Sequence, residues 1–169
     1  LGIVPVVSAV MGTTAGGPSM RAILAHWSIM VKGTGQIFAA GPPVVERAFG
    51  DKLHKDELGG TKIAVDTAGT IDNVAESEQD CFKQIRQFLS YMPQNVWELP
   101  PAMTCRDPVD RCEDALASIV PRSSRQAYNM KKLVGMIVDR DSLFEIQPTF
   151  GRALITALAR MNGKVVGII

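Results

Sequence analysis

The stretch Val4-Pro5-Val6-Val7-Ser8-Ala9-Val10-Met11, followed at once by Gly12-Thr13-Thr14-Ala15-Gly16-Gly17-Pro18, decides the fold class of this chain. An almost unbroken apolar run of this length is typical of a strand covered on both faces of a sheet. The glycine-rich segment predicts a flexible loop, and proline favours the first helical position because its missing N–H would be unpaired there anyway. We therefore predict a strand, a glycine-rich turn and a helix over 19–25, with Ile23 and Leu24 facing inward.

Working outward, strands and helices alternate along the rest of the chain, which indicates the α/β class. The apolar pattern predicts short strands over residues 28–31, 36–40, 62–65, 143–146 and 164–169. Helical spacing and capping signals predict helices over residues 42–48, 76–89, 110–119, 130–137 and 154–161. In the second of these helices, one apolar face is predicted to consist of Phe82, Ile85, Leu89 and Met92. Residues 55–60 are predicted to be a loop, and an Asp110–Glu113 capping box is expected to open the third helix.

Composition excludes several functional classes. The 169 residues are 46% hydrophobic and 21% charged, which is typical of a globular domain rather than a disordered chain. A net charge of +1 without blocks of like charge argues against a nucleic-acid partner. No apolar run reaches the roughly 20 residues of a membrane span. The three cysteines argue for a reducing compartment, and the spacing of Cys105 and Cys112 is not that of a zinc ribbon, so no metal is predicted.

Side-chain catalysts are hard to find in this sequence. His26 and His54 have no partner at a recognisable spacing, and a helix-capping or surface role is expected for both. Gly33-Thr34-Gly35 starts like a dinucleotide motif but Phe38 stands where its third glycine belongs. The remaining candidate is the Gly12–Gly17 loop, where free N–H groups at a helix start can stabilise an oxyanion. A tight turn without a ligand is the alternative, and the spacing alone favours it.

Several short segments, in order, carry a resemblance to one family. The first group comprises Ala15-Gly16-Gly17, Phe38-Ala39-Ala40-Gly41-Pro42-Pro43-Val44-Val45, Glu57-Leu58-Gly59-Gly60, Ala68-Gly69-Thr70-Ile71-Asp72 and Leu89-Ser90-Tyr91-Met92-Pro93-Gln94-Asn95. The second comprises Ile119-Val120-Pro121, Tyr128-Asn129-Met130, Ile137-Val138-Asp139, Phe144-Glu145 and Ala159-Arg160-Met161-Asn162-Gly163. Together they resemble the carboxyltransferase (beta) subunits of the biotin-dependent propionyl-CoA, acetyl-CoA and methylcrotonyl-CoA carboxylases.

The resemblance implies a particular domain organisation. Members of this family contain two domains of the crotonase (ClpP/crotonase) fold, each a stack of βα units. Residues 1–94 would form the later part of the first, acyl-CoA-side domain, and 110–169 the start of the second, biotin-side domain. The proline-rich stretch 95–109 would join them. Both chain ends lie in apolar, strand-like sequence, which fits a partial chain, and we expect the isolated 169 residues to be inactive.

The resemblance also implies a chemistry and a set of partners. The family moves CO2 from carboxybiotin, held on a partner protein, to the α-carbon of an acyl-CoA, without a metal. Backbone N–H groups of Gly16 and Gly17 would stabilise the thioester oxyanion. Biotin carboxylase and biotin carboxyl carrier subunits would be the partners, and a hexameric ring of dimers the assembly, in the cytoplasm or mitochondrial matrix. Lys131 follows a methionine as in biotin attachment sites, but it lies in a predicted helix, so biotin is not expected on this chain.

The chain departs from the family pattern at a few places. Pro18 follows the glycine pair and offers no N–H, so any donors must be Gly16 and Gly17 themselves. Ala64 and Asn73 stand where many members carry histidine. Two alternatives stay open: a biotin-dependent decarboxylase or transcarboxylase subunit, which uses the same site, and a non-catalytic relative that binds acyl-CoA or holds an assembly together.

Overall fold

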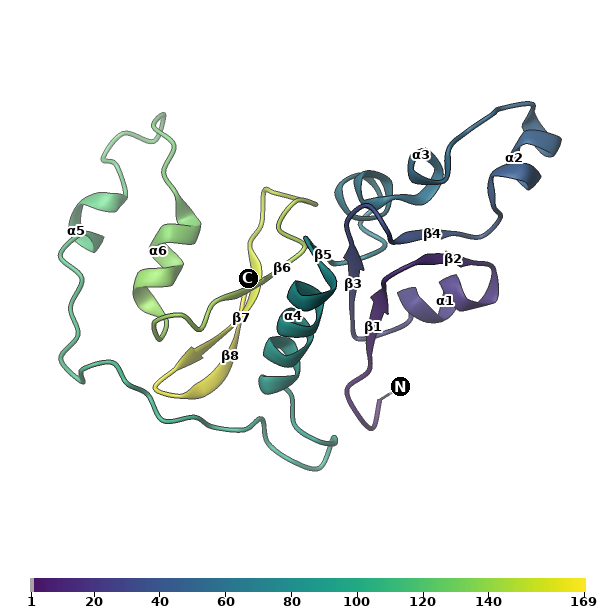
Figure 1. The fold of residues 1–169 in the computed structure, drawn as a ribbon. Coiled ribbons are helices and arrows are strands. Elements are labelled where there is room, and N and C mark those ends of the chain that lie inside the picture. The colour runs from purple at the N-terminus through teal and green to yellow at the C-terminus, as the bar shows by residue number, and fades with distance from the viewer. Residues whose placement is uncertain (1) are drawn as a thin grey trace.

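The computed structural model describes residues 2–169, and its N-terminal half is built around a small parallel sheet (Figure 1). Strand β3 (Trp27–Val31) lies in the centre, with β1 (Val7–Val10) on one side and β5 (Asn73–Ala75) on the other. Every residue of β3 is buried. In β1, Val10 is buried, Val7 and Ser8 are half-buried and Ala9 is exposed. The predicted strand over residues 4–11 is therefore shorter than expected and lies at an edge, where one side is open.

A second sheet forms where a flexible loop was predicted. Strand β2 (Thr13–Ala15) pairs in parallel with β4 (Gln36–Phe38). Helix α1 (Gly17–Ile23) follows β2, and α2 (Pro42–Phe49) follows β4 and ends at Gly50, as predicted. Each strand is thus followed directly by a helix, which gives the alternating arrangement that the sequence predicted.

The inward face of α1 differs from the prediction. Ile23 and Leu24 are 49% and 60% exposed, and Ser19 and Ala22 are buried instead. Helix α1 contacts β1 and β2, and Ala22 belongs to the same buried cluster as Val10 of β1. The prediction was wrong because large apolar residues were assumed to face the core, and here the close approach of helix and strands favours small ones.

Two helical segments, over residues 55–59 and 62–67, correct the predicted loop and strand. Helix α3 (Lys55–Gly59) is capped by His54, whose N–H donates to Glu57 at 2.8 Å while its Nδ1 accepts from the Asp56 N–H at 3.4 Å. This confirms the expected capping role of His54. The π-helix η1 (Lys62–Thr67) then replaces the strand predicted over residues 62–65. Three apolar residues in a row, Ile63 to Val65, do not distinguish a buried strand from a buried helical turn.

Helix α4 (Glu78–Ser90) is the longest in the chain, and Figure 1 shows it between the N-terminal strands and the C-terminal sheet. Ser77 caps it by accepting from the Asp80 N–H at 3.1 Å. The helix was predicted, but its buried face is centred on Cys81 and Phe88, while Phe82 and Leu89 are 44% and 40% exposed. Burial raises the pKa of the Cys81 thiol, so this cysteine is a packing residue rather than a reactive one.

The C-terminal sheet is antiparallel, in the order β6 (Phe144–Ile146), β7 (Thr156–Met161) and β8 (Lys164–Ile168). A helix was predicted over residues 154–161, and this was wrong. Asn162 and Gly163 both have positive φ, 50° and 73°, and form a two-residue turn between β7 and β8. Asn-Gly is the strongest short-range signal for such a hairpin, and it outweighs the helical spacing of the apolar residues before it.

Two short helices precede the C-terminal sheet in the sequence. Helix α5 (Leu116–Ile119) begins later than predicted, and α6 (Met130–Ile137) begins at the predicted residue, capped by Asn129. The predicted Asp110–Glu113 capping box does not form; the Glu113 carboxylate binds arginine side chains instead. Residues 91–115 contain no helix or strand. No helix among residues 2–169 combines the length and the apolar character needed to cross a bilayer.

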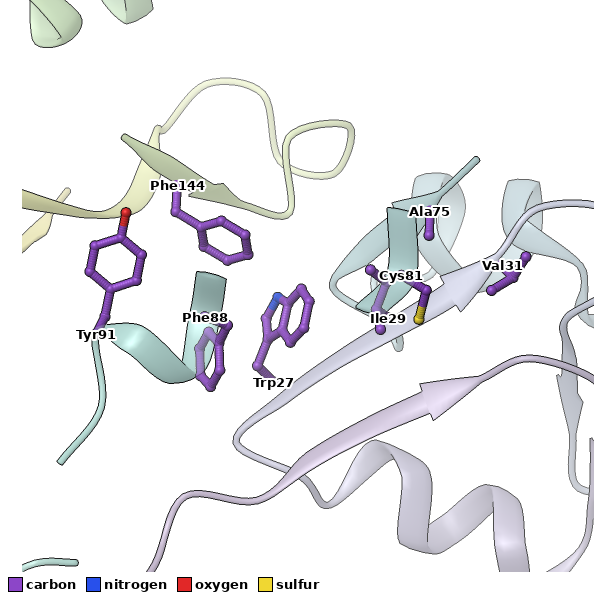
Figure 2. Close-up of a cluster of buried hydrophobic side chains, with 8 residues drawn as sticks. All are labelled: Trp27, Ile29, Val31, Ala75, Cys81, Phe88, Tyr91 and Phe144. Atoms are coloured by element: carbon purple, nitrogen blue, oxygen red, sulfur yellow. The ribbon is translucent and has the colours of Figure 1, made fainter. Parts of the chain in front are cut away.

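Aromatic side chains from β3, from α4 and the residue after it, and from β6 pack together in one core (Figure 2). Trp27 stacks on Phe88 with ring centres 5.0 Å apart, and Phe144 packs edge-on against Trp27 at 5.4 Å. The Tyr91 hydroxyl donates to the Ser142 carbonyl oxygen at 2.6 Å. Strand β6 therefore completes the core that β3 and α4 begin. The proposed division into two domains at residues 95–109 stays a prediction.

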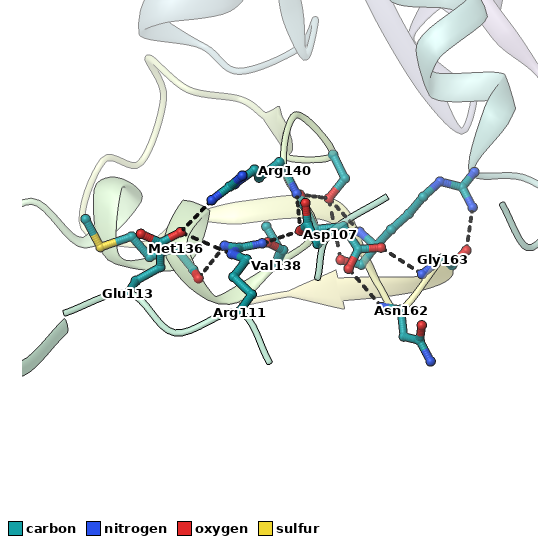
Figure 3. Close-up of polar contacts among 11 residues, drawn as sticks. Asp107, Arg111, Glu113, Met136, Val138, Arg140, Asn162 and Gly163 are labelled. Atoms are coloured by element: carbon teal, nitrogen blue, oxygen red, sulfur yellow. Dashed lines mark hydrogen bonds and ion pairs between the residues drawn. The ribbon is translucent and has the colours of Figure 1, made fainter. Parts of the chain in front are cut away.

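A polar cluster holds the segment before α5 against the loop after α6 (Figure 3). The guanidinium of Arg111 donates to the carbonyl oxygens of Met136 and Val138 at 2.5 and 2.9 Å, and it also pairs with Asp107 and Glu113. Asp107 in turn accepts from the Arg140 N–H at 3.0 Å. Since carbonyl oxygens at the end of a helix lack partners within it, Arg111 caps α6 from another part of the chain.

We expect this cluster to weaken in acid. The Arg140 N–H and, to a smaller extent, the Arg111 guanidinium hold the pKa of Asp107 below its ordinary 3.8, although burial opposes them. A lowered folded pKa stabilises the fold above the ordinary value, and this contribution is lost as pH falls through the lowered one. Wild type should therefore lose stability relative to Asp107→Asn below about pH 4. Unfolding midpoints of both proteins between neutral and acid pH measure this, and parallel curves would contradict it.

Candidate active site

The glycine pair lies at the junction of β2 and α1. Gly16 is the N-cap of α1, with φ 67° and ψ −132°, a conformation that residues with a Cβ rarely adopt. This turn directs the chain out of β2 and into the helix within a single residue. Glycine is thus required at position 16 because of the positive φ of its backbone. From the sequence, this segment could be predicted only as a flexible loop.

The two amides of the pair differ in their surroundings. The Gly16 N–H donates to the Phe38 carbonyl oxygen at 3.1 Å and so extends the β2–β4 ladder. The Gly16 carbonyl oxygen accepts from the Ser19 N–H at 3.0 Å and from the Ser19 hydroxyl at 2.5 Å. In a trans peptide the next N–H points the opposite way, so the Gly17 N–H points out of the helix start. Within residues 2–169, nothing accepts from it.

Open space lies beside Gly17. The residue is exposed, and a Cβ built on it would have no heavy atom within 4 Å apart from its own neighbours. Pro18, also exposed, contributes no N–H that could compete for an acceptor. The structure therefore offers one unpaired, outward-facing amide where two were predicted.

Glycines in the neighbouring motif segments allow close packing within the fold. Gly59 allows α3 to approach β4 so closely that a Cβ there would lie 1.9 Å from the Ile37 carbonyl oxygen. Gly69 is also crowded, since a Cβ would lie 2.6 Å from the ring of Phe150. Asn73 is buried and accepts from the Trp27 indole N–H at 3.1 Å.

The two histidines are engaged in local hydrogen bonds. His26 Nδ1 accepts from the Val6 N–H at 2.9 Å, and the His26 N–H donates to the Val6 carbonyl oxygen at the same distance. His54 caps α3, as described above. Lys131, the lysine that follows Met130, lies in α6 and forms an ion pair with Glu145. These contacts give each of the three side chains a structural partner.

One group of possible metal ligands does come together. Donor atoms of Cys105, Asp107 and Asp139 lie within 4.8 Å of one another, along a groove of about 1200 Å³. The carboxylate of Asp139 already accepts from the Asn162 and Gly163 N–H groups at 2.8 and 2.7 Å. Asp107 is similarly bound to Arg140 and Arg111. Because both carboxylates are used by backbone and arginine donors, they serve to hold the hairpin turn and the 105–111 segment in place.

Comparison with known proteins places this site in context. The Carboxyl transferase domain family matches residues 2–169. The human mitochondrial propionyl-CoA carboxylase beta chain is 36% identical over 99% of this chain, and the alignment covers 31% of the human protein. The methylmalonyl-CoA decarboxylase subunit alpha of Veillonella parvula is 35% identical over the same share, with 33% of that protein covered. The chain thus spans about a third of the length of these relatives.

Solved structures show the same fold. A crystal structure of transcarboxylase 12S, described as a hexamer with hydrolysed methylmalonyl-coenzyme A bound, superimposes with a TM-score of 0.92 at 31% identity. The superposition covers 98% of this chain and 32% of the transcarboxylase chain. A single-chain, multi-domain long-chain acyl-CoA carboxylase superimposes with a TM-score of 0.77 at 24% identity, which speaks for the fold alone. The predicted crotonase-like α/β class is confirmed, and the chain belongs to the carboxyl transferase domain family.

Proposed function

We propose that the protein transfers CO2 between carboxybiotin and the α-carbon of an acyl-CoA, and that this chain supplies part of the acyl-CoA side of the site. The observation that carries the proposal is the unpaired N–H of Gly17, an exposed residue at the start of α1. The family assignment and the human and bacterial relatives support it, since their names describe carboxylation or decarboxylation of acyl-CoA thioesters.

The chain's own contribution is electrostatic. When the α-proton of an acyl-CoA leaves, negative charge gathers on the thioester oxygen, and an N–H aimed at that oxygen lowers the barrier. We propose that Gly17 donates this hydrogen bond; the backbone beside it is held by the Gly16 bonds to Phe38 and Ser19. A donor that is held in place before the reaction requires no reorganisation during it. Carboxybiotin would supply the CO2 and the base; the residues described here supply no side-chain base.

The role of Gly16 stays a prediction. We infer that its main task is the positive-φ turn, because its N–H is bound to Phe38. Donation from Gly16 to a thioester oxygen would require that bond to break. A second donor for the oxyanion, and the cover that excludes water from the exposed Gly17, would come from other parts of the assembled protein.

Partners follow from the proposed chemistry. We infer that a biotin carboxylase and a biotin carboxyl carrier deliver the carboxyl group, and that the assembly is a ring of dimers of the hexameric type described for transcarboxylase 12S. A metal has no part in this proposal. The relatives include mitochondrial chains, and we propose the mitochondrial matrix or the cytoplasm as the compartment.

The reverse direction is a second candidate. The Veillonella relative is a methylmalonyl-CoA decarboxylase subunit at nearly the same identity as the human carboxylase chain, 35% against 36%. The same N–H would stabilise the same enolate oxygen in either direction, because forward and reverse reactions share one transition state. The direction would then depend on the partner proteins rather than on the residues described here.

Activity of the intact protein tests the proposal. We expect carboxylation of at least one of propionyl-, acetyl- and methylcrotonyl-CoA with carboxybiotin, or decarboxylation of methylmalonyl-CoA in the presence of biotin, with products followed by mass spectrometry. The isolated 169-residue chain should show none, because a single exposed amide provides neither a second donor nor a dry site. A folded intact protein that binds acyl-CoA without either reaction would overturn the catalytic proposal and favour a non-catalytic relative.

A further inference from the structure

Gln36 is a fully buried polar side chain at the first position of β4. Its amide oxygen accepts from the Thr13 hydroxyl at 2.6 Å, and its amide nitrogen donates to the Asp56 carboxylate at 2.6 Å. Thr13 belongs to β2 and Asp56 to α3. One side chain therefore links the strand that leads into the glycine pair with a helix on the other side of β4.

Helix α3 also contacts β4 at Ile37, the residue that follows Gln36. Gly59 of α3 lies against the Ile37 carbonyl oxygen, with no room for a Cβ between them. The close approach brings the first turn of α3 within reach of Gln36, because Asp56 and Gly59 lie on neighbouring turns of the helix. The first glycine of the Glu57-Leu58-Gly59-Gly60 segment therefore has a structural role: it allows α3 to pack closely against β4.

Three consecutive residues of β4 thus connect α3 to the candidate site. Gln36 binds Asp56 and Thr13, Ile37 contacts Gly59, and Phe38 accepts the Gly16 N–H at 3.1 Å. The position of the Phe38 carbonyl oxygen fixes Gly16, and Gly16 orients the Gly17 N–H. A shift of β4 relative to β2 would therefore move the proposed oxyanion donor.

A buried polar link is an unusual way to fill this space. An apolar side chain of similar size would pack there without needing partners, whereas each end of Gln36 must be hydrogen-bonded to avoid a penalty. What the hydrogen bonds add is direction, since they allow only one placement of β2 and α3 around β4. Direction matters most where a catalytic donor has to be held within a fraction of an ångström.

We propose that Gln36 and Asp56 are positioning residues for the Gly17 amide in carboxyl transfer, an inference that rests on the proposed function. They act through β4 and Gly16 and do not touch the substrate. Loss of the Gln36–Asp56 link should lower the turnover number and leave substrate binding largely unchanged, because the thioester oxygen gains its charge only in the transition state.

The test compares matched variants of the intact protein. Gln36→Met keeps the shape and removes both hydrogen bonds, and Asp56→Ala removes the acceptor. Asp56→Asn keeps an oxygen that can accept from Gln36 and should retain most of the activity. We expect Gln36→Met and Asp56→Ala to lower kcat per folded site about 10- to 100-fold, with a much smaller change in KM for the acyl-CoA.

A glutamine elsewhere provides the control for lost stability. Gln84 on α4 also forms two hydrogen bonds, to the Val74 carbonyl oxygen at 3.1 Å and to Asp80 at 2.9 Å, far along the chain from the glycine pair. Gln84→Met should reduce thermal stability without changing kcat per folded site. Deuterium exchange at the Gly16 amide should speed up in Gln36→Met and stay unchanged in Gln84→Met, because only the former loosens the bond to Phe38.

The outcomes separate the two proposals. If wild type transfers CO2 but Gln36→Met keeps its kcat per folded site, or Asp56→Asn loses as much as Asp56→Ala, the positioning role is wrong and the proposed function stands. If folded wild type shows no transfer in either direction, both proposals fail. Slower turnover with unchanged KM and faster exchange at Gly16 supports both.

Discussion

Replacing Gly17 by proline should lower the turnover number about 10²- to 10³-fold, which is the usual cost of removing one oxyanion donor. Proline lacks the N–H that Gly17 provides, and the substitution removes no existing hydrogen bond, since this amide has no acceptor within the described part of the chain. The measurement is kcat of the intact protein per folded site, with acyl-CoA binding measured separately.

The fold should tolerate this change. Helix α2 of the same chain already begins with Gly41 followed by Pro42 and Pro43, so a glycine and two prolines open a helix without difficulty here. Gly17→Ala is the matched control, because it keeps the N–H and places its Cβ where no heavy atom lies within 4 Å. Equal losses in both variants would show that bulk at this position matters rather than the amide, and would remove the main support for the proposed function.

Truncating Trp27 to alanine should destabilise the fold by about 3–5 kcal/mol, the usual range for a fully buried large aromatic residue. Its side chain is completely buried, stacks on Phe88, meets Phe144 edge-on and donates to Asn73. The cavity would open at the point where β3, α4 and β6 meet. Urea unfolding followed by circular dichroism measures the free energy of unfolding of the intact protein.

Trp97→Ala is the matched control for this prediction. Trp97 is 79% exposed, and its contact with the Asn95 side chain is made by its backbone N–H, which the substitution keeps. A surface change of this kind alters stability by about 0.5 kcal/mol or less. If the two substitutions cost similar amounts, the aromatic cluster would not be the centre of the core, and β6 would not depend on it.

Local signals in the sequence predicted several elements well. The helix predicted over residues 42–48, from two prolines at its start and a glycine at its end, forms as α2 (Pro42–Phe49), and Gly50 does adopt the left-handed conformation expected there. Helix α6 also begins at the predicted residue, Met130, although its apolar spacing rather than its Asn129 cap indicated it. Such signals succeed because a cap or a helix-starting proline acts through the backbone within one turn.

Predictions that depended on which face is buried were less successful. The α4 helix was expected, but Phe88 and Cys81 face the core in place of Phe82 and Leu89. The choice depends on Trp27 and Phe144, which lie far from α4 in the sequence. The β7 strand was missed for the opposite reason, since helical spacing was given more weight than the Asn162-Gly163 turn beside it.

By itself, the sequence determined the alternating α/β character, the family resemblance and the glycine pair as the place to look for backbone chemistry. Only the tertiary structure decided which of the two amides is available, because the partner of the Gly16 N–H is Phe38, in a strand that the chain reaches after passing through α1 and β3. Tertiary contacts also decided the link from Asp56 through Gln36 to Thr13. Hydrogen bonds between segments distant in sequence leave no local pattern, and they fix where a donor points.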